Sequence, residues 1–105
     1  MPIISEVKGC GSYLPKNFVT NHELAKIIDT SDEWITQRTG IKERRISDLA
    51  KGEHPSGMAE RAAREAIKNA GWEVDEVECI LFATTIPDMM LPNTASMLQA
   101  ALGIT

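Results

Sequence analysis

A tryptophan and an arginine four residues apart, Trp34 and Arg38, are the side chains of this sequence best suited to bind a small molecule. On a helix, residues at this spacing are neighbours on one face. An indole ring and a guanidinium plane both hold flat heteroaromatic groups by stacking and cation–π contact. A guanidinium also binds phosphate through two parallel hydrogen bonds. The pair therefore predicts a site for a base and its phosphates, which is the chemistry of a nucleotide such as the head of coenzyme A.

Hydroxyl and basic residues flank this pair. Thr30 and Thr39 stand at the two ends of the expected helix, and Lys42, Arg44 and Arg45 follow it directly. Four of the chain's eleven basic residues fall between positions 38 and 45, although the net charge is −4. A tryptophan in the core beside a solvated basic face would give the same pattern. From the residue types alone, both interpretations stay open.

The remaining reactive residues form no catalytic or metal-binding set. Cys10 lies in a glycine-rich turn and Cys79 opens an apolar run. Neither has a neighbouring base or helix N-terminus that would activate a thiol, so both are expected to be small apolar side chains. His22 and His54 are expected at the surface. No ligand spacing indicates a metal site.

Hydrophobic periodicity and turn signals predict the elements that position these side chains. Apolar runs at residues 3–7 and 79–85 are typical of strands, the second one buried on both faces. Helices are expected over residues 20–28, over 30–39 with Thr30 and Glu33 as a capping box, and over 55–70 and 93–102. Residues 41–46 alternate as a strand or an extended arm. This order predicts an α/β fold with helices packed on a parallel or mixed sheet.

Two glycines and an alanine-rich helix face each indicate a close approach of backbone, and the alanine face suits a helix pressed closely onto a sheet. Gly9 and Gly11 follow the first expected strand, where they let the chain bend or be approached closely. A dinucleotide-binding loop would need a third glycine opening a helix, and Leu14-Pro15 stands there instead. Small alanines recur on one face of the helix expected over residues 55–70, with pairs Glu60–Arg64 and Arg61–Glu65 on the other.

Composition excludes several classes of protein. The net charge of −4 argues against a nucleic-acid-binding protein. No apolar run approaches the roughly 20 residues of a membrane helix, and no secretory signal is visible. Two unpaired cysteines in such a chain indicate a reduced, cytoplasmic protein.

Residues 29–45, DTSDEWITQRTGIKERR, closely resemble the signature segment of the β-ketoacyl-acyl-carrier-protein synthase III family. Residues 9–15, 83–85 and 102–104 resemble further family landmarks, and residues 47–56 are the part least similar to the family. The resemblance implies a thiolase fold of two similar α/β halves in a homodimer. It also implies an acyl transfer from acyl-CoA to a cysteine, followed by decarboxylative condensation with malonyl-acyl-carrier-protein to begin fatty acid synthesis. No permanently bound cofactor is implied, because coenzyme A enters as part of the substrate.

The same resemblance assigns residues to the substrate. At the positions of Trp34, Arg38 and Thr39 the family holds the nucleotide end of coenzyme A, and Thr30 matches a further contact near it. Leu91 matches a position through which the partner subunit lines the acyl pocket. The family's nucleophilic cysteine, histidine and asparagine would all lie beyond residue 105. We therefore expect residues 1–105 to be an N-terminal fragment of the first thiolase-like domain, incomplete, without a second domain and inactive alone.

Two other interpretations remain open at this point. Hydroxymethylglutaryl-CoA synthases and polyketide-type synthases share the scaffold and change the reaction. A non-catalytic module that binds coenzyme A or a partner protein would use the same exposed pair without the chemistry.

Overall fold

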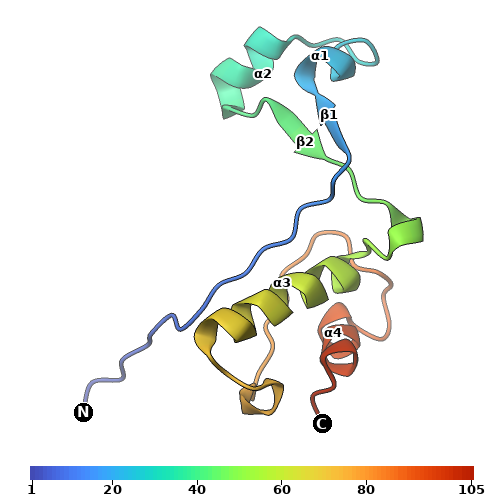
Figure 1. The fold of residues 1–105 in the computed structure, drawn as a ribbon. Helices are drawn as coiled ribbons and strands as arrows, with labels where there is room; N and C mark the ends of the chain where they lie inside the picture. The colour runs from blue at the N-terminus through green and yellow to red at the C-terminus, as the bar shows by residue number, and fades with distance from the viewer.

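The computed structural model describes all of residues 1–105 and arranges them as two lobes joined by two passes of the chain (Figure 1). The Cα radius of gyration is 17.5 Å and the longest extent is 51 Å. A compact domain of this length would have a radius of gyration of about 13 Å. The chain is thus elongated. One end is formed by residues 17–46, which we call the α2 lobe after its longest helix, and the other by residues 47–105 with the N-terminal segment alongside, which we call the α3 lobe.

The α2 lobe is a small antiparallel hairpin that carries two helices at its tip. Thr20 and Glu23 form a capping box at the start of the first helix, with the Thr20 amide donating to Glu23 Oε2 at 2.8 Å. The helix predicted over residues 20–28 is shorter in the structure. It ends after a single turn at Leu24, and turns follow it. In chain order the elements are β1 (Phe18–Thr20), α1 (Asn21–Leu24), α2 (Asp32–Thr39) and β2 (Glu43–Arg45).

Helix α2 begins one residue later than predicted from Thr30 as its N-cap residue. Ser31, and not Thr30, is the N-cap residue, and its hydroxyl accepts from the Trp34 amide at 3.1 Å. Both residues have suitable side chains, and only the backbone path selects between them. The helix ends at Gly40, whose φ of 71° is the left-handed conformation that glycine adopts without strain.

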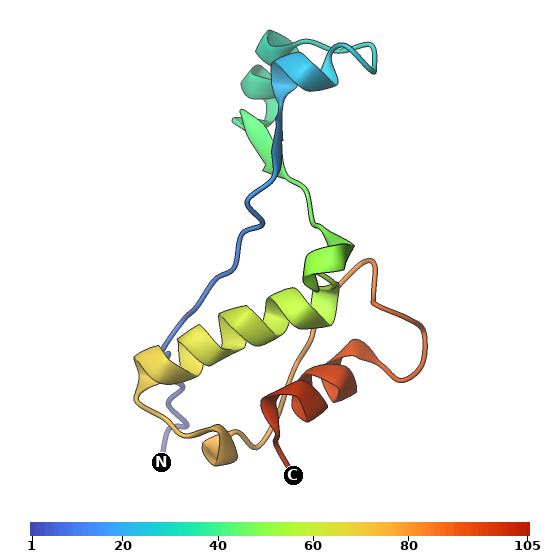
Figure 2. The same ribbon diagram turned by 45° about the vertical axis from the view of Figure 1, so that its right-hand side comes forward.

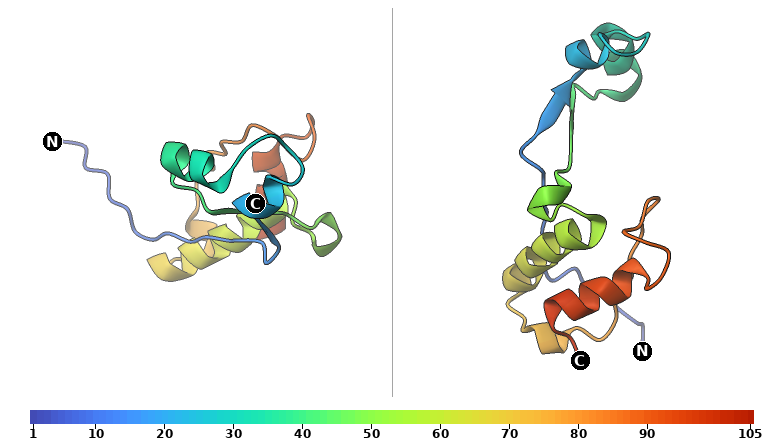
Figure 3. Two further views of the ribbon diagram at one scale, coloured as in Figure 1. Left: turned by 90° about the horizontal axis from the view of Figure 1, so that it is seen from above. Right: turned by 90° about the vertical axis from the view of Figure 1, so that its right-hand side faces the viewer.

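The α3 lobe packs two helices side by side, as Figure 3 shows on its right. Arg64 of α3 bonds Glu60 in the predicted pair at 2.8 Å and also donates to the Ala101 carbonyl of α4 at 2.9 Å. The predicted Arg61–Glu65 pair is wrong, because each partner is engaged elsewhere. The elements are η1 (Leu49–Lys51), α3 (Pro55–Ala70), η2 (Val74–Glu76) and α4 (Thr94–Leu102).

The alanine face of α3 receives the N-terminal segment at the two glycines. A Cβ on Gly9 would lie 2.5 Å from the Ala66 carbonyl oxygen, and one on Gly11 would lie 2.2 Å from that of Ala62. Neither distance is sterically possible, so the contact requires glycine at both positions. The predicted close approach is confirmed, although the neighbour of the helix is an extended segment and not a sheet.

The strands predicted at residues 3–7 and 79–85 do not form. Both segments run past α3 as extended coil (Figure 2) and make no backbone hydrogen bonds to a neighbouring strand. Ile3 is 98% exposed and Leu81 is 95% exposed, so the predicted burial of the second run, with Cys79 in it, is also wrong. The only sheet is the antiparallel pair β1-β2. A strand needs a hydrogen-bonded neighbour, and these residues supply none.

Candidate binding site on helix α2

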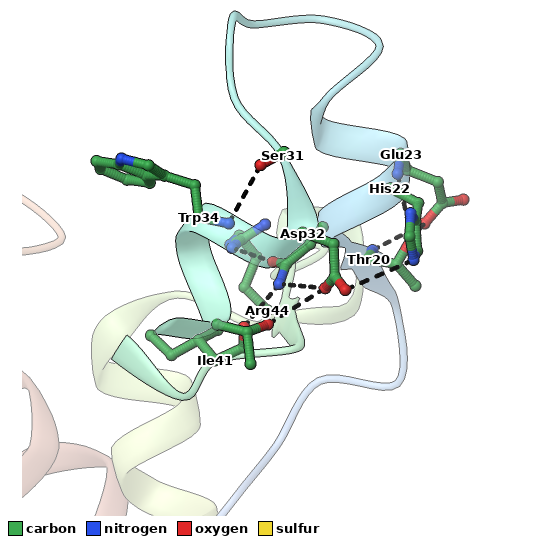
Figure 4. A network of polar contacts seen from close by, with 10 residues as sticks. Thr20, His22, Glu23, Ser31, Asp32, Trp34, Ile41 and Arg44 are labelled. Atoms are coloured by element: carbon green, nitrogen blue, oxygen red, sulfur yellow. Dashed lines mark hydrogen bonds and ion pairs between the residues drawn. The ribbon is translucent and has the colours of Figure 1, made fainter. Parts of the chain in front are cut away.

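Trp34 and Arg38 form the predicted pair on the outer face of α2. The guanidinium carbon of Arg38 lies 4.9 Å from the centroid of the Trp34 ring, within the range of a cation–π contact. Trp34 is 55% exposed, and its indole points away from the rest of the lobe (Figure 4). The alternative in which this tryptophan belongs to the core is therefore wrong. The flat surface is open to a ligand.

The spacing of the pair limits how a planar base can bind. A ring held between indole and guanidinium needs contacts of about 3.5 Å on each side, or roughly 7 Å in all. At 4.9 Å the two groups already touch. A base must therefore stack on the free face of the indole or displace the Arg38 side chain. Arg38 is free to move in this way, because it takes part in no ion pair of the structure.

Thr30 lies beside the indole, and Thr39 stands at the other end of the helix. An open hollow of about 340 Å³ is lined by Asp29, Thr30, Ser31 and Trp34. Thr39 donates its hydroxyl to the Ile35 carbonyl at 2.8 Å and accepts from the Ile41 amide at 3.1 Å. A hydroxyl has one hydrogen and two lone pairs. Thr39 can thus still accept a hydrogen bond from a ligand, but it has no hydrogen left to donate to a phosphate.

Two residues of the basic run that follows α2 hold the lobe together. Arg44 donates to Asn21 Oδ1 at 2.9 Å. Arg45 donates to the Pro15 carbonyl at 2.9 Å and lies 3.6 Å from a Glu43 carboxylate oxygen. Of the four basic residues between positions 38 and 45, Arg38 and Lys42 therefore remain for an anionic ligand.

Asn21 is a part of the site that the sequence analysis missed. Its amide nitrogen donates to Asp32 Oδ1 at 2.9 Å and to the Ile41 carbonyl at 2.6 Å. Figure 4 labels these two partners. The hydrogen bond from Asn21 is the main cause that lowers the pKa of Asp32, with smaller contributions from the charges of His22 and Lys42. In sequence, an asparagine in a first helical turn looks like an ordinary surface residue, so no signal indicated its role.

Leu91 belongs to the loop of residues 86–93, which lies on the α3 lobe, away from the α2 site (Figure 1). It is 83% exposed in the loop that precedes α4. Asp88 ties this loop to the first turn of α3, because its carboxylate accepts from the Ser56 amide at 2.8 Å and from the Ser56 hydroxyl at 2.5 Å. The sequence analysis missed this cap as well. The structure therefore does not bring Leu91 together with Trp34.

The other sequence candidates gather into no further site. Cys10 and Cys79 are both exposed thiols, and His22 and His54 are exposed as predicted. No three His, Cys, Asp or Glu side chains are grouped so that they could hold a metal ion. None of the helices is long and apolar enough to cross a bilayer.

Several curated relatives of the chain share the name β-ketoacyl-[acyl-carrier-protein] synthase III. No family model matches. The β-ketoacyl-[acyl-carrier-protein] synthase III of Rhodospirillum centenum is 51% identical over 105 residues, which are the whole chain and 32% of the relative. The enzyme of that name from Neisseria meningitidis is 50% identical over 101 residues, or 96% of this chain and 31% of the relative. The chain thus spans about a third of the length of the curated relatives it matches.

Solved structures agree with these relatives. The 3-oxoacyl-[acyl-carrier-protein] synthase III of Aquifex aeolicus superimposes with a TM-score of 0.82 at 50% identity, covering 90% of this chain and 30% of that one. The priming β-ketosynthase of the R1128 polyketide pathway gives 0.70 at 33% identity, covering 92% and 28%. The expected α/β fold of the thiolase type is confirmed by these neighbours, although the paired parallel strands are not formed within residues 1–105.

Proposed function

This chain is a homologue of β-ketoacyl-[acyl-carrier-protein] synthase III over about a third of that enzyme's length. From this we propose that it is part of an enzyme with the same activity. The protein that contains it is an acyltransferase-type condensing enzyme. It takes an acyl group from acyl-CoA onto a cysteine, then condenses that group with malonyl-acyl-carrier-protein. Carbon dioxide leaves, and the 3-ketoacyl product begins fatty acid synthesis. Residues 1–105 contribute the site for the nucleotide end of coenzyme A.

The observation that carries this proposal is the exposed Trp34–Arg38 pair. An indole that is more than half exposed and already in contact with a guanidinium is a prepared surface for a purine ring. Arg38 brings a positive charge to the same surface, which suits the phosphates of coenzyme A. Thr30 lines the hollow beside the indole, and Thr39 offers one acceptor lone pair. These four residues are our candidates for contacts with the nucleotide.

The acyl group and the chemistry belong to other parts of the protein. Leu91, on its exposed loop, is the candidate for lining the acyl pocket of a partner subunit in a homodimer. The cysteine, histidine and asparagine of the reaction are expected outside residues 1–105. The protein would act in the cytoplasm without a permanently bound cofactor. The curated relatives that are about 50% identical to the chain are named synthase III, which favours the fatty acid reaction.

Titration calorimetry of coenzyme A into the protein that carries this chain tests the proposal. Trp34→Ala should weaken binding by about 1–3 kcal/mol, the usual loss when a stacked base loses its aromatic partner. Arg38→Ala should weaken coenzyme A more than its 3′-dephospho form if the guanidinium meets that phosphate. Lys26→Ala, an exposed cation of the same lobe, is the matched control and should bind normally. Wild-type affinity in Trp34→Ala would refute the site.

A further inference from the structure

We propose that Asn21 is a positioning residue that sets how α2 presents Trp34 and Arg38 to the nucleotide of coenzyme A. This inference rests on the proposed function. Asn21 lies on α1 and not on the binding helix, and its fully buried side chain (0% exposed) is turned away from solvent and so from the ligand. Its effect must therefore pass through the residues it holds.

Every polar group of the Asn21 side chain is used. Both amide hydrogens are donated, one to Asp32 Oδ1 at 2.9 Å and one to the Ile41 carbonyl at 2.6 Å. The amide oxygen accepts from Arg44 Nη2 at 2.9 Å. These partners fix the orientation of the amide, because the reversed group would turn its NH₂ toward the Arg44 donor. A buried amide with all its partners matched is costly to alter.

The partners of Asn21 bracket the binding helix. Asp32 is the first residue of α2, and Ile41 lies just past its last residue. One side chain thus holds both ends of the helix, while Arg44 joins it to β2. The backbone of Asn21 adds a fourth contact, since its amide donates to the Lys42 carbonyl at 3.1 Å.

Helix α2 needs this support because little else holds it. It has eight residues, well below the length at which an isolated helix is stable in water. Ile35 is its only buried residue. The orientation of Trp34 and Arg38 therefore depends on polar contacts at the two ends of the helix, and Asn21 makes contacts at both.

The charge pattern of the network supports the same role. Arg44 donates to the oxygen of Asn21, and the nitrogen of Asn21 donates to the Asp32 carboxylate, so the amide dipole links a cation to an anion. In such a chain each hydrogen bond polarises the next. Asn21→Asp would place a carboxylate oxygen against both Asp32 Oδ1 and the Ile41 carbonyl, and so turn both donated hydrogen bonds into repulsions. Asn21→Ala would remove all three side-chain contacts.

Two substrates that differ only in the nucleotide separate positioning from general stability. The complete enzyme is assayed with acyl-CoA and with the same acyl group on N-acetylcysteamine, a thioester that has no nucleotide. We expect Asn21→Ala and Asn21→Asp to lower kcat/KM for acyl-CoA about tenfold or more, mostly through KM. The short thioester should stay within about twofold of wild type. Arg44→Lys, a milder change at the same network, should show the same split to a smaller degree.

Two controls separate a positioning role of Asn21 from a purely structural one. Asn69→Ala removes an asparagine that donates to the Cys10 carbonyl at 2.9 Å on the α3 lobe, and it should affect both substrates equally or not at all. Equal losses on both substrates in the Asn21 and Arg44 variants would show a purely structural role and overturn the inference, as would no loss on either. A wild-type enzyme that does not prefer acyl-CoA over the short thioester would instead overturn the proposed function itself.

Discussion

Replacing Gly11 by alanine measures how closely the N-terminal segment lies against α3. The new Cβ would lie 2.2 Å from the Ala62 carbonyl oxygen, 2.5 Å from the Ala66 nitrogen and 2.9 Å from the Glu65 Cβ. Since ordinary contacts begin near 3.5 Å, the segment must retreat by roughly 1 Å. The retreat strains the hydrogen bond from the Ser12 amide to Glu65 Oε2, now 2.8 Å. Overpacking of this kind costs about 1–3 kcal/mol, and the upper end is expected because backbone atoms cannot rotate away.

Thermal unfolding of the complete protein reads out this cost. A loss of 1 kcal/mol lowers Tm by about 2–4 °C in a protein of roughly 150–250 residues and by less in a longer one, so Gly11→Ala should lower Tm by several degrees. Gly40→Ala is the control. No atom lies within 4 Å of its Cβ position, and it bears only the cost of the left-handed conformation, about 1–2 kcal/mol. A Tm for Gly11→Ala at or above that of Gly40→Ala would refute the close packing.

Three further predictions concern other contacts of the structure. Asp88→Asn should lower stability by about 1 kcal/mol and speed proteolysis in residues 86–92, because the charged cap on Ser56 is lost; unchanged cleavage there would contradict it. The Tyr13 hydroxyl donates to Glu53, and this hydrogen bond is the main cause that lowers the pKa of Glu53 from its usual 4.5. The ionised carboxylate therefore stabilises the fold above pH 4.5, and this contribution is lost as the pH falls below 4.5 and through the lowered pKa. Tyr13→Phe should therefore lower Tm at pH 7 more than at pH 3, and an equal loss at both would argue against the link. A polypeptide of residues 1–105 alone should take no radiolabel from acyl-CoA, because the expected nucleophile lies outside it, and covalent labelling would disprove this.

Local signals were sufficient for the two longest helices, α3 and α4. Helices α3 and α4 run from Pro55 and Thr94 to residues just before Gly71 and Gly103, as periodicity and end residues predicted. The Trp34–Arg38 pair could also be predicted, because residues four apart on a helix meet whatever surrounds the helix. The resemblance of residues 29–45 to synthase III then assigned a ligand to that pair, which the spacing by itself did not.

Contacts between distant residues could not be read from the sequence. An apolar run indicates a strand only if another strand lies beside it, and the segments at 3–7 and 79–85 have no such partner here. Asn21 and Arg44 are 23 positions apart, and neither has a local pattern that indicates the other. The same holds for Asp88 and Ser56, which are 32 positions apart.

The α2 lobe is closed at its base by a hydrogen bond between its two ends. The Ile46 amide donates to the Asn17 carbonyl at 2.9 Å, so residues 17–46 leave the rest of the chain and return to it at one place. A segment closed at its own base can unfold as a unit while α3 and α4 stay packed, at a free energy below that of global unfolding. The amides of the α2 lobe should then exchange their hydrogens at a common rate, as one cooperative unit. A nucleotide bound on Trp34 would slow exchange throughout the α2 lobe, including at amides far from the ligand.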